Sequence, residues 1–115
     1  MTKIDLRQGN LEMMILRILS GGAQHGWGIA QRIHLLSQET LKIEEGSLYL
    51  ALYRMQRQGW IRAEWGQSDN NRRAKFYELT PAGRRQLETH REGWDRLCAA
   101  IAQVMRAEDP TSAKR

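Results

Sequence analysis

The sequence predicts a mainly α-helical fold with one small β-hairpin, arranged as a winged helix-turn-helix with a long helix at its C-terminal end. Two helical patterns, at about 26–37 and 44–58, follow one another at short spacing. Two alternating segments joined by turn residues come directly after them, as in a hairpin that serves as a wing. A last pattern of helical period then occupies most of the remaining chain.

Length and charge limit the architecture and the partners. The 115 residues suffice for one compact domain. Lys and Arg outnumber Asp and Glu by 18 to 13, which favours an anionic partner, with nucleic acid ahead of a membrane. No apolar run approaches the roughly 20 residues of a transmembrane helix. The start of the chain lacks the apolar stretch of a signal peptide, and the single cysteine, Cys98, suits a reducing compartment, so we expect a cytoplasmic protein.

Two helices are expected before the hairpin and before the basic helix. The first spans about 9–20, where Leu11, Met14 and their neighbours recur at helical spacing. The Gly-rich segment 21–26 is interpreted as a turn, because it lacks the Gly-Lys-Ser/Thr ending of a phosphate-binding loop and no strand precedes it. The second helix, at about 26–37, has an expected apolar set of Trp27, Ile29, Ile33 and Leu36.

The segment at 44–58 is predicted to be a recognition helix with two different faces. Its inward stripe is expected to consist of Leu48, Leu52 and Met55, at positions i, i+4 and i+7. The opposite side, small at its start and cationic further on, is expected to carry Ser47, Ala51, Arg54 and Gln58. Such a helix can enter a major groove, although an ordinary surface helix with solvated arginines has the same pattern. The preceding 41–43 is either a short edge strand or an extended link.

The hairpin after this helix is expected to be basic at its tip. Residues 60–65 alternate apolar and polar side chains, 68–71 are turn residues, and 72–79 return. Ile61, Ala63 and Trp65 are expected on one face, with Tyr77 and Leu79 directed inward. The tip is expected to hold Arg72, Arg73 and Lys75 together, where they can reach phosphates or the adjacent minor groove. A solvated basic turn is the alternative.

The last helix is expected to run from Pro81 to about Ala107, with Thr80 as its cap. Its apolar residues, with His90 in the same register, are spaced alternately by three and four, as in a heptad seam: Leu87, His90, Trp94, Leu97, Ile101 and Val104. A narrow seam on a long terminal helix predicts self-association. We therefore divide the chain into a DNA-binding unit at 1–80, a dimerisation helix at 81–107 and a flexible tail at 108–115. Cys98, one position off the seam, is expected to be a small buried residue.

Several runs of residues resemble the PadR family of bacterial transcriptional regulators. They are Glu45-Gly46-Ser47-Leu48-Tyr49, Gly59-Trp60-Ile61 and the run from Arg73 to Gly83. The run that starts at His25 looks like the family's His-Gly-Tyr-Gly-Ile, with Trp27 in place of Tyr. The resemblance implies a homodimer formed through the C-terminal helix, and repression at inverted repeats. Where family members often carry Pro, this chain has Leu50, which places a larger apolar group near the groove.

The residues and the resemblance together define three expected sites. The DNA-binding set is Ser47, Tyr49, Leu50, Arg54, Arg57, Arg72, Arg73 and Lys75. The dimer interface is Leu11, Met14, Leu87, Trp94, Leu97, Ile101 and Val104. In the multidrug-sensing branch of the family, a Trp at the matching position pairs across the two-fold axis and sandwiches flat aromatic effectors. The resemblance therefore makes Trp94, with His90 nearby, the candidate contact for such an effector; simple packing in the interface is the other interpretation.

The sequence contains no recognisable catalytic or metal-binding motif. His25, His34 and His90 share no spacing, and His25 is interpreted as the start of a helix. We therefore expect no enzyme activity, no cofactor and no metal. The alternative to a DNA-binding regulator is a winged-helix module that senses a ligand or binds a protein without binding DNA. The clustering of basic residues favours the regulator, and the narrow apolar seam disfavours a membrane surface.

Overall fold

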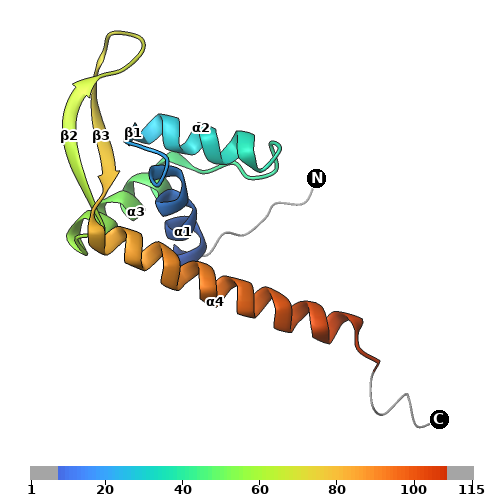
Figure 1. Cartoon of the computed structure of the whole chain (residues 1–115). Helices are drawn as coiled ribbons and strands as arrows, with labels where there is room; N and C mark the ends of the chain where they lie inside the picture. Colours follow the sequence, from blue (N-terminus) through green and yellow to red (C-terminus); the bar gives the residue numbers. More distant parts are fainter. Residues whose placement is uncertain (1–7, 109–115) are drawn as a thin grey trace.

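The structure, a computed structural model, describes residues 8–108 and has the predicted mainly helical fold with a small antiparallel sheet. Helices α1, α2 and α3 form a cluster, the β2–β3 hairpin stands beside it, and α4 extends away from it (Figure 1). The strand order is β1-β3-β2. In chain order the elements are α1 (Gln8–Leu19), β1 (Gln24–His25), α2 (Gly26–Leu36), α3 (Glu45–Arg57), β2 (Ile61–Gln67), β3 (Arg73–Leu79) and α4 (Pro81–Arg106).

The core lies where the helical cluster meets the base of the hairpin. The predicted inward stripe of α3 is confirmed, since Leu48, Leu52 and Met55 are at most 2% exposed. Tyr77 and Leu79 are buried, as predicted. Other fully buried side chains come from α1, α2 and β2: Ile15, Leu16, Leu19, Ile29 and Ile61. Burial of each such side chain contributes about 1.5–3 kcal/mol, so this cluster holds the basic helix and the hairpin in a defined relation.

Before α2 one prediction needs correction, and after α2 the structure decides between two predicted alternatives. Residues 24–25, interpreted as part of a turn, form strand β1, which pairs with β3 through Gln24↔Tyr77 and His25↔Phe76. The 41–43 segment is the extended link and not the strand. His25 does begin a helix: its Nδ1 accepts a hydrogen bond from the backbone N–H of Gly28 at 3.0 Å.

The buried face of α2 is smaller than predicted. Trp27 and Leu36, both expected to point inward, are 66% and 61% exposed. Glycines 26 and 28 occupy the inner positions instead, together with Ile29 and Ile33. A Cβ at Gly26 would overlap the ring of Tyr49, so the absence of a side chain there lets α2 pack closely against α3.

The start of α4 is anchored to the beginning of the hairpin. The Thr80 hydroxyl caps the helix by accepting from the N–H of Gly83 at 3.1 Å, and donates to the carbonyl of Gly59 at 2.6 Å. The Thr80 N–H donates to the carbonyl of Trp60 at 3.1 Å. A Cβ at Gly83 would collide with that same carbonyl, so glycine permits this close approach. The direction of α4 is thus set by Gly59 and Trp60, the two residues that precede β2.

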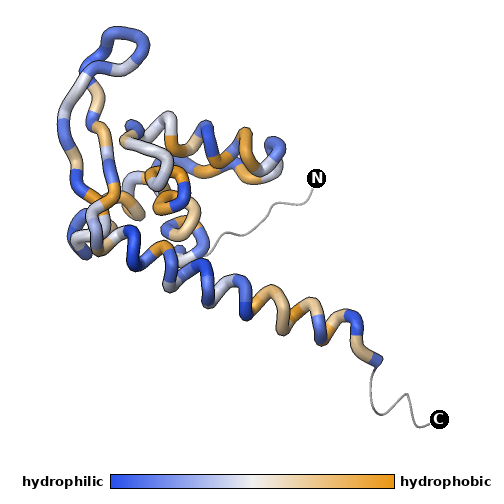
Figure 2. Tube along the Cα trace, in the orientation of Figure 1, coloured by the Kyte–Doolittle hydropathy of each residue, from blue (hydrophilic) through white to orange (hydrophobic). Residues whose placement is uncertain are grey.

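Beyond Leu87, α4 leaves the core and carries an exposed apolar seam along its outer half (Figure 2). Trp94 is 41% exposed, and Leu97 and Ile101 are each 52% exposed. Cys98 is exposed as well, contrary to the prediction that it is buried. Of the predicted tail, residues 109–115 lie outside the described part of the chain. Within 8–108, no helix has the length and apolar character needed to cross a membrane.

Candidate nucleic-acid interface

The exposed face of α3 is rotated relative to the predicted one. Ala51, expected on the outer side, is fully buried beside Leu48 and Leu52. Since successive helical residues are about 100° apart, the side opposite this buried stripe carries Gly46, Leu50, Tyr53 and Arg57. Leu50 is 62% exposed and Tyr53 is 58% exposed, so the outward face is centred on large apolar and aromatic groups. We call these four residues the outward face of α3.

Arg54 lies at the flank of this face and is directed toward α1. Its Nε donates to Oε2 of Glu12 at 3.3 Å, and the side chain of Glu12 is only 10% exposed. Gln8 donates to the same carboxylate oxygen at 3.4 Å. The pair therefore neutralises a carboxylate within the helical cluster and ties α3 to α1. A DNA contact by Arg54 stays a prediction, as does one by Ser47, which is exposed at the other end of the same flank.

Arg57 remains on the outward face near the end of α3. Its Nη1 donates to the Tyr53 hydroxyl at 3.2 Å, and its Cζ lies 5.8 Å from the centre of the Tyr53 ring. A cation over an aromatic face is attracted by the negative side of the ring. These contacts lay the guanidinium along the helix, where it stays exposed. Arg57 is thus placed beside Tyr53, one turn or more away from Leu50.

The sequence predicted that the cations of the wing gather at its tip, but the structure spreads them between the turn and strand β3. Arg72 lies in the turn, where the N–H of Ser68 donates to its carbonyl at 2.8 Å, but Arg73 and Lys75 lie on β3. The register pairs Trp65 with Lys75. Because alternate residues of a strand share a face, Arg73 and Lys75 lie on the same side of the hairpin as Trp65 and Tyr77. The Arg73 guanidinium stacks over the Trp65 ring, with its Cζ 4.3 Å from the ring centre.

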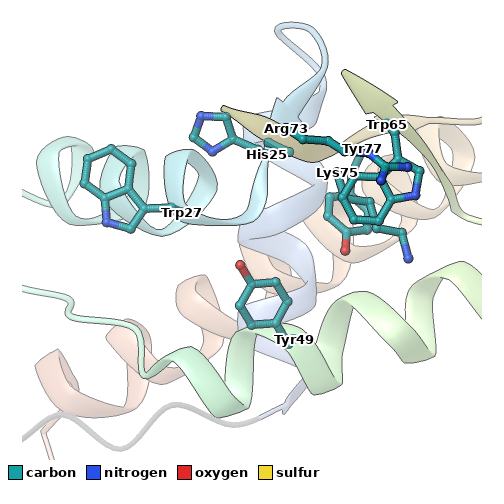
Figure 3. Close-up of a pocket in the computed structure, with 8 residues that line it drawn as sticks. His25, Trp27, Tyr49, Trp65, Arg73, Lys75 and Tyr77 are labelled. Carbon is teal, nitrogen blue, oxygen red and sulfur yellow. The ribbon is translucent and has the colours of Figure 1, made fainter. Parts of the chain in front are cut away.

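This side of the wing forms one wall of a cleft of about 550 Å³ between the hairpin, the start of α2 and the start of α3. The Tyr49 side chain extends from α3 toward the cleft, and the wing residues stand on the other side (Figure 3). None of the described residues that line it carries a carboxylate. The cleft is therefore aromatic and cationic, and its lining is His25, Trp27, Tyr49, Trp65, Arg73, Ala74, Lys75 and Tyr77.

The phenol at the base of the cleft stays neutral. Burial raises the pKa of the Tyr77 hydroxyl above its ordinary value of 10.0, and the neighbouring Tyr49 hydroxyl raises that pKa further. At neutral pH, Tyr77 therefore adds no negative charge. The positive charges of Arg73 and Lys75 are left to act on whatever anion approaches the cleft.

Two aromatic residues of this surface are absent from the predicted DNA-binding set. Trp27 is expected in the apolar set of the second helix and Trp65 on the strand face of Ile61 and Ala63, but they are 66% and 56% exposed and both line the cleft. A signal was present for Trp65. It shares a strand face with Ile61 and Ala63, yet its position in the hairpin pairs it with Lys75, which is a poor neighbour for a core residue.

The remaining predicted sites lie on α4 and α1. His90 packs edge-on against Trp60, with ring centres 6.2 Å apart, while Trp94 is partly exposed one turn further along. Leu11 and Leu87 are buried within the chain itself and so offer a partner little surface; Met14 is partly buried. Among the described residues, no group of three or more His, Cys, Asp or Glu is placed to hold a metal ion.

Known proteins are similar to this chain in sequence and in fold. The family model described as the transcriptional regulator PadR-like family matches residues 15–89. A relative from Lysinibacillus sphaericus, named only as an uncharacterised protein, is 27% identical over 94 residues, which cover 82% of this chain and 86% of the relative.

Solved structures agree with the family model. A transcriptional regulator from Clostridium thermocellum is 27% identical with a TM-score of 0.76, over 84% of this chain and 93% of that one. A PadR-like transcriptional regulator from Bacillus cereus is 27% identical with a TM-score of 0.76, over 88% of this chain and 96% of that one. A PadR family transcription regulator from Clostridium difficile is 28% identical with a TM-score of 0.72, over 83% and 97%. Because the family model matches more than half of this chain, the chain belongs to the PadR-like family of transcriptional regulators.

Proposed function

We propose that this protein is a sequence-specific DNA-binding repressor that acts as a homodimer on an inverted-repeat operator. One observation supports the proposal above the others. The outward face of α3 and the cationic cleft of the wing are adjacent, because Tyr49 at the start of α3 lines the cleft. A helix that can enter a groove thus lies beside cations that can bind the neighbouring phosphate backbone of the DNA. DNA recognition requires both, because base contacts give specificity and phosphate contacts position the protein.

In this arrangement the two parts of the surface contact different parts of the duplex. The outward face of α3 enters the major groove. Arg73 and Lys75 hold phosphates along one strand, and the side chains of Trp27 and Trp65 give the cleft apolar walls against which deoxyribose can pack. Arg72, in the turn of the wing, reaches the adjacent minor groove or its phosphates.

The exposed half of α4 supports the dimer. An isolated amphipathic helix gains little stability in water, so a seam of apolar side chains at this exposure favours packing against a second copy. Pairing through Trp94, Leu97, Ile101 and Val104 leaves 1–80 as the DNA-binding part and 81–107 as the dimerisation helix. Two-fold symmetry would then require half-sites whose centres are about 34 Å, or one helical turn, apart.

Selection of bound sequences from random duplex DNA tests the proposal. We expect an inverted repeat to be enriched at about 0.15 M salt, with half-sites separated by about one helical turn. The selected duplex should bind one dimer, as measured by sedimentation of the complex. If the wild-type protein shows no preference for any duplex over random DNA under these conditions, the proposed function is wrong.

A further inference from the structure

The outward face of α3 is apolar at the place where a groove-reading helix comes nearest to the bases. Leu50 is 62% exposed, and one turn earlier stands Gly46, which has no side chain and open space around it. The residue one turn later is Tyr53, whose hydroxyl accepts a hydrogen bond from Arg57. Leu50 therefore projects from α3 with open space at Gly46 on one side and, on the other, Tyr53, which is hydrogen-bonded to Arg57.

The chemistry of the major groove offers one feature to such a side chain. Base edges there present hydrogen-bond donors and acceptors, together with the C5-methyl group of thymine. The isobutyl group of Leu50 neither donates nor accepts hydrogen bonds. Its contact with a donor or acceptor of a base would remove water from that polar group without supplying a new hydrogen bond. A methyl group gains from the same contact, because apolar surface is removed from water on both sides.

We propose that Leu50 reads a thymine in each half-site through the C5-methyl group of that base. The inference rests on the proposed function, because it requires α3 to enter a major groove. It goes further by naming the residue and the chemical group that set part of the sequence preference.

The charges around Leu50 favour DNA over an apolar protein partner at this face. Arg57 lies on the same helix face, and Arg73 and Lys75 line the adjoining cleft, so the apolar centre is bordered by cations. That border complements phosphates on either side of a groove. The gap at Gly46 lets the helix backbone approach the base edges closely.

Replacement of thymine by deoxyuridine tests the inference, because it removes the methyl group and leaves every base pair and hydrogen-bonding group in place. Each thymine of the selected half-site is replaced singly, and the Kd is measured for wild type and for Leu50→Ala. For wild type we expect a loss of about fourfold at one position, the scale of one buried methyl-sized group. For Leu50→Ala, thymine and deoxyuridine at that position should bind with equal affinity. Alanine favours helix at this exposed site, so the variant should fold.

Leu36→Ala is the matched control. Leu36 is 61% exposed, close to the value for Leu50, but it ends α2 and lies off the outward face of α3. This variant should retain the wild-type loss with deoxyuridine. Equal binding of thymine and deoxyuridine by wild type at every position would overturn the methyl readout and leave the proposed function intact. Discrimination that persists in Leu50→Ala would overturn the assignment to Leu50, and absence of any preferred duplex would overturn the proposed function itself.

Discussion

Glu12 is a carboxylate inside the helical cluster, and its surroundings decide what Arg54 contributes. The residue is 7% exposed, and Oε2 receives hydrogen bonds from both Arg54 and Gln8. A buried carboxylate that loses its cationic partner keeps the cost of its desolvation without the compensating attraction. Arg54 thus has a structural role that sequence periodicity could not reveal, because the partner lies on another helix.

Arg54→Ala should lower the free energy of unfolding by about 1–3 kcal/mol, since it leaves the Glu12 carboxylate short of a donor. Urea denaturation measures the loss. The double variant Glu12→Gln with Arg54→Ala removes the carboxylate charge that needs a partner. It should therefore recover part of the lost free energy of unfolding. Arg57→Ala serves as the matched control, because its guanidinium is exposed and bonded to Tyr53 instead. Equal stability of Arg54→Ala and wild type would show that the ion pair between Arg54 and Glu12 does not stabilise the fold.

The DNA-binding role predicted for Arg54 is separable from this structural one. A site selection with Arg54→Ala, carried out below its unfolding temperature, should change the preferred bases if the guanidinium also reaches a base edge. An unchanged selected sequence would limit Arg54 to the contact with Glu12.

Arg73→Ala should weaken binding to all duplexes to a similar extent. Its guanidinium stacks on Trp65 and lines the cleft, where the proposed function places a strand backbone, so we expect it to contact phosphate and not bases. Each proposed dimer carries two copies of Arg73, so the variant loses one phosphate contact in each half-site. The slope of log K against log salt should therefore fall by about two. Titrations at several salt concentrations measure both effects. Arg106→Ala, a change of the same charge at the far end of α4, should leave the slope unchanged, and an equal effect of the two variants would contradict the assignment.

The hairpin shows which properties of an element can be predicted from sequence and which cannot. Alternation correctly placed Ile61, Ala63 and Trp65 on one face, and the turn residues correctly placed the reversal. Alternation identifies a face but does not say where the core ends, and the hairpin extends past the core. The outer part of the same face therefore becomes the wall of the cleft, with Trp65 exposed. Strand β1 was missed for a related reason, since two residues become a strand only by pairing with β3.

The Tyr77 hydroxyl makes the stability of this hairpin sensitive to alkaline pH. Its pKa is raised above 10.0 in the folded state, chiefly by burial. The unfolded chain therefore releases the proton at a lower pH than the folded chain, and stability falls as pH rises above 10.0 through the folded pKa. Urea midpoints from about pH 8 to about pH 11 should show this decline. Tyr77→Phe removes the titrating group and should reduce the slope, whereas Tyr53→Phe, at an exposed position, should not.

Considered as a whole, the molecule consists of a packed cluster and a helix that leaves it. The heptad spacing predicted the seam of α4, and the structure leaves Trp94, Leu97, Ile101 and Val104 uncovered by the rest of the described chain. Leu87 was assigned to the same interface because it fits the spacing of the seam, and Leu11 as a contribution from the first helix, but both pack inside the chain. A periodic pattern identifies a buried face without saying whether the chain itself or a partner covers it.

Ile101→Asp should dissociate the proposed dimer. The change places an unpaired carboxylate in the middle of the seam, and burial of such a charge is strongly unfavourable. Sedimentation at micromolar concentration should show a monomer, and affinity for the inverted repeat should collapse because the two half-sites are no longer held together. Gln103→Asp introduces the same charge on the opposite side of α4 and should leave the dimer intact. A dimeric Ile101→Asp variant would show that the interface lies elsewhere.

Trp94 decides whether the proposed dimer also contains a binding site for a flat aromatic effector. Its side chain is 41% exposed, the lowest value on the uncovered seam, and it stands one turn beyond His90, whose ring packs against Trp60. Leu or Ile fits a helix seam better than an indole, so Trp94 either fills a wide gap between the helices or borders one. Because large aromatic residues in a seam bury much surface, we expect packing. Trp94→Leu should then lower the melting temperature and leave dye binding unchanged.

Titration with planar cationic dyes, monitored by tryptophan fluorescence, measures whether a dye binds at Trp94. A cationic aromatic dye would stack on an exposed indole, with an added cation–π attraction. Trp27 and Trp65 are exposed as well, so Trp65→Leu is the necessary control for dye that binds the cleft of the wing. Saturable quenching that is lost in Trp94→Leu but kept in Trp65→Leu, while the dimer persists, would contradict the expectation of packing. It would place an effector pocket between the two C-terminal helices, where occupancy could change the separation of the recognition helices.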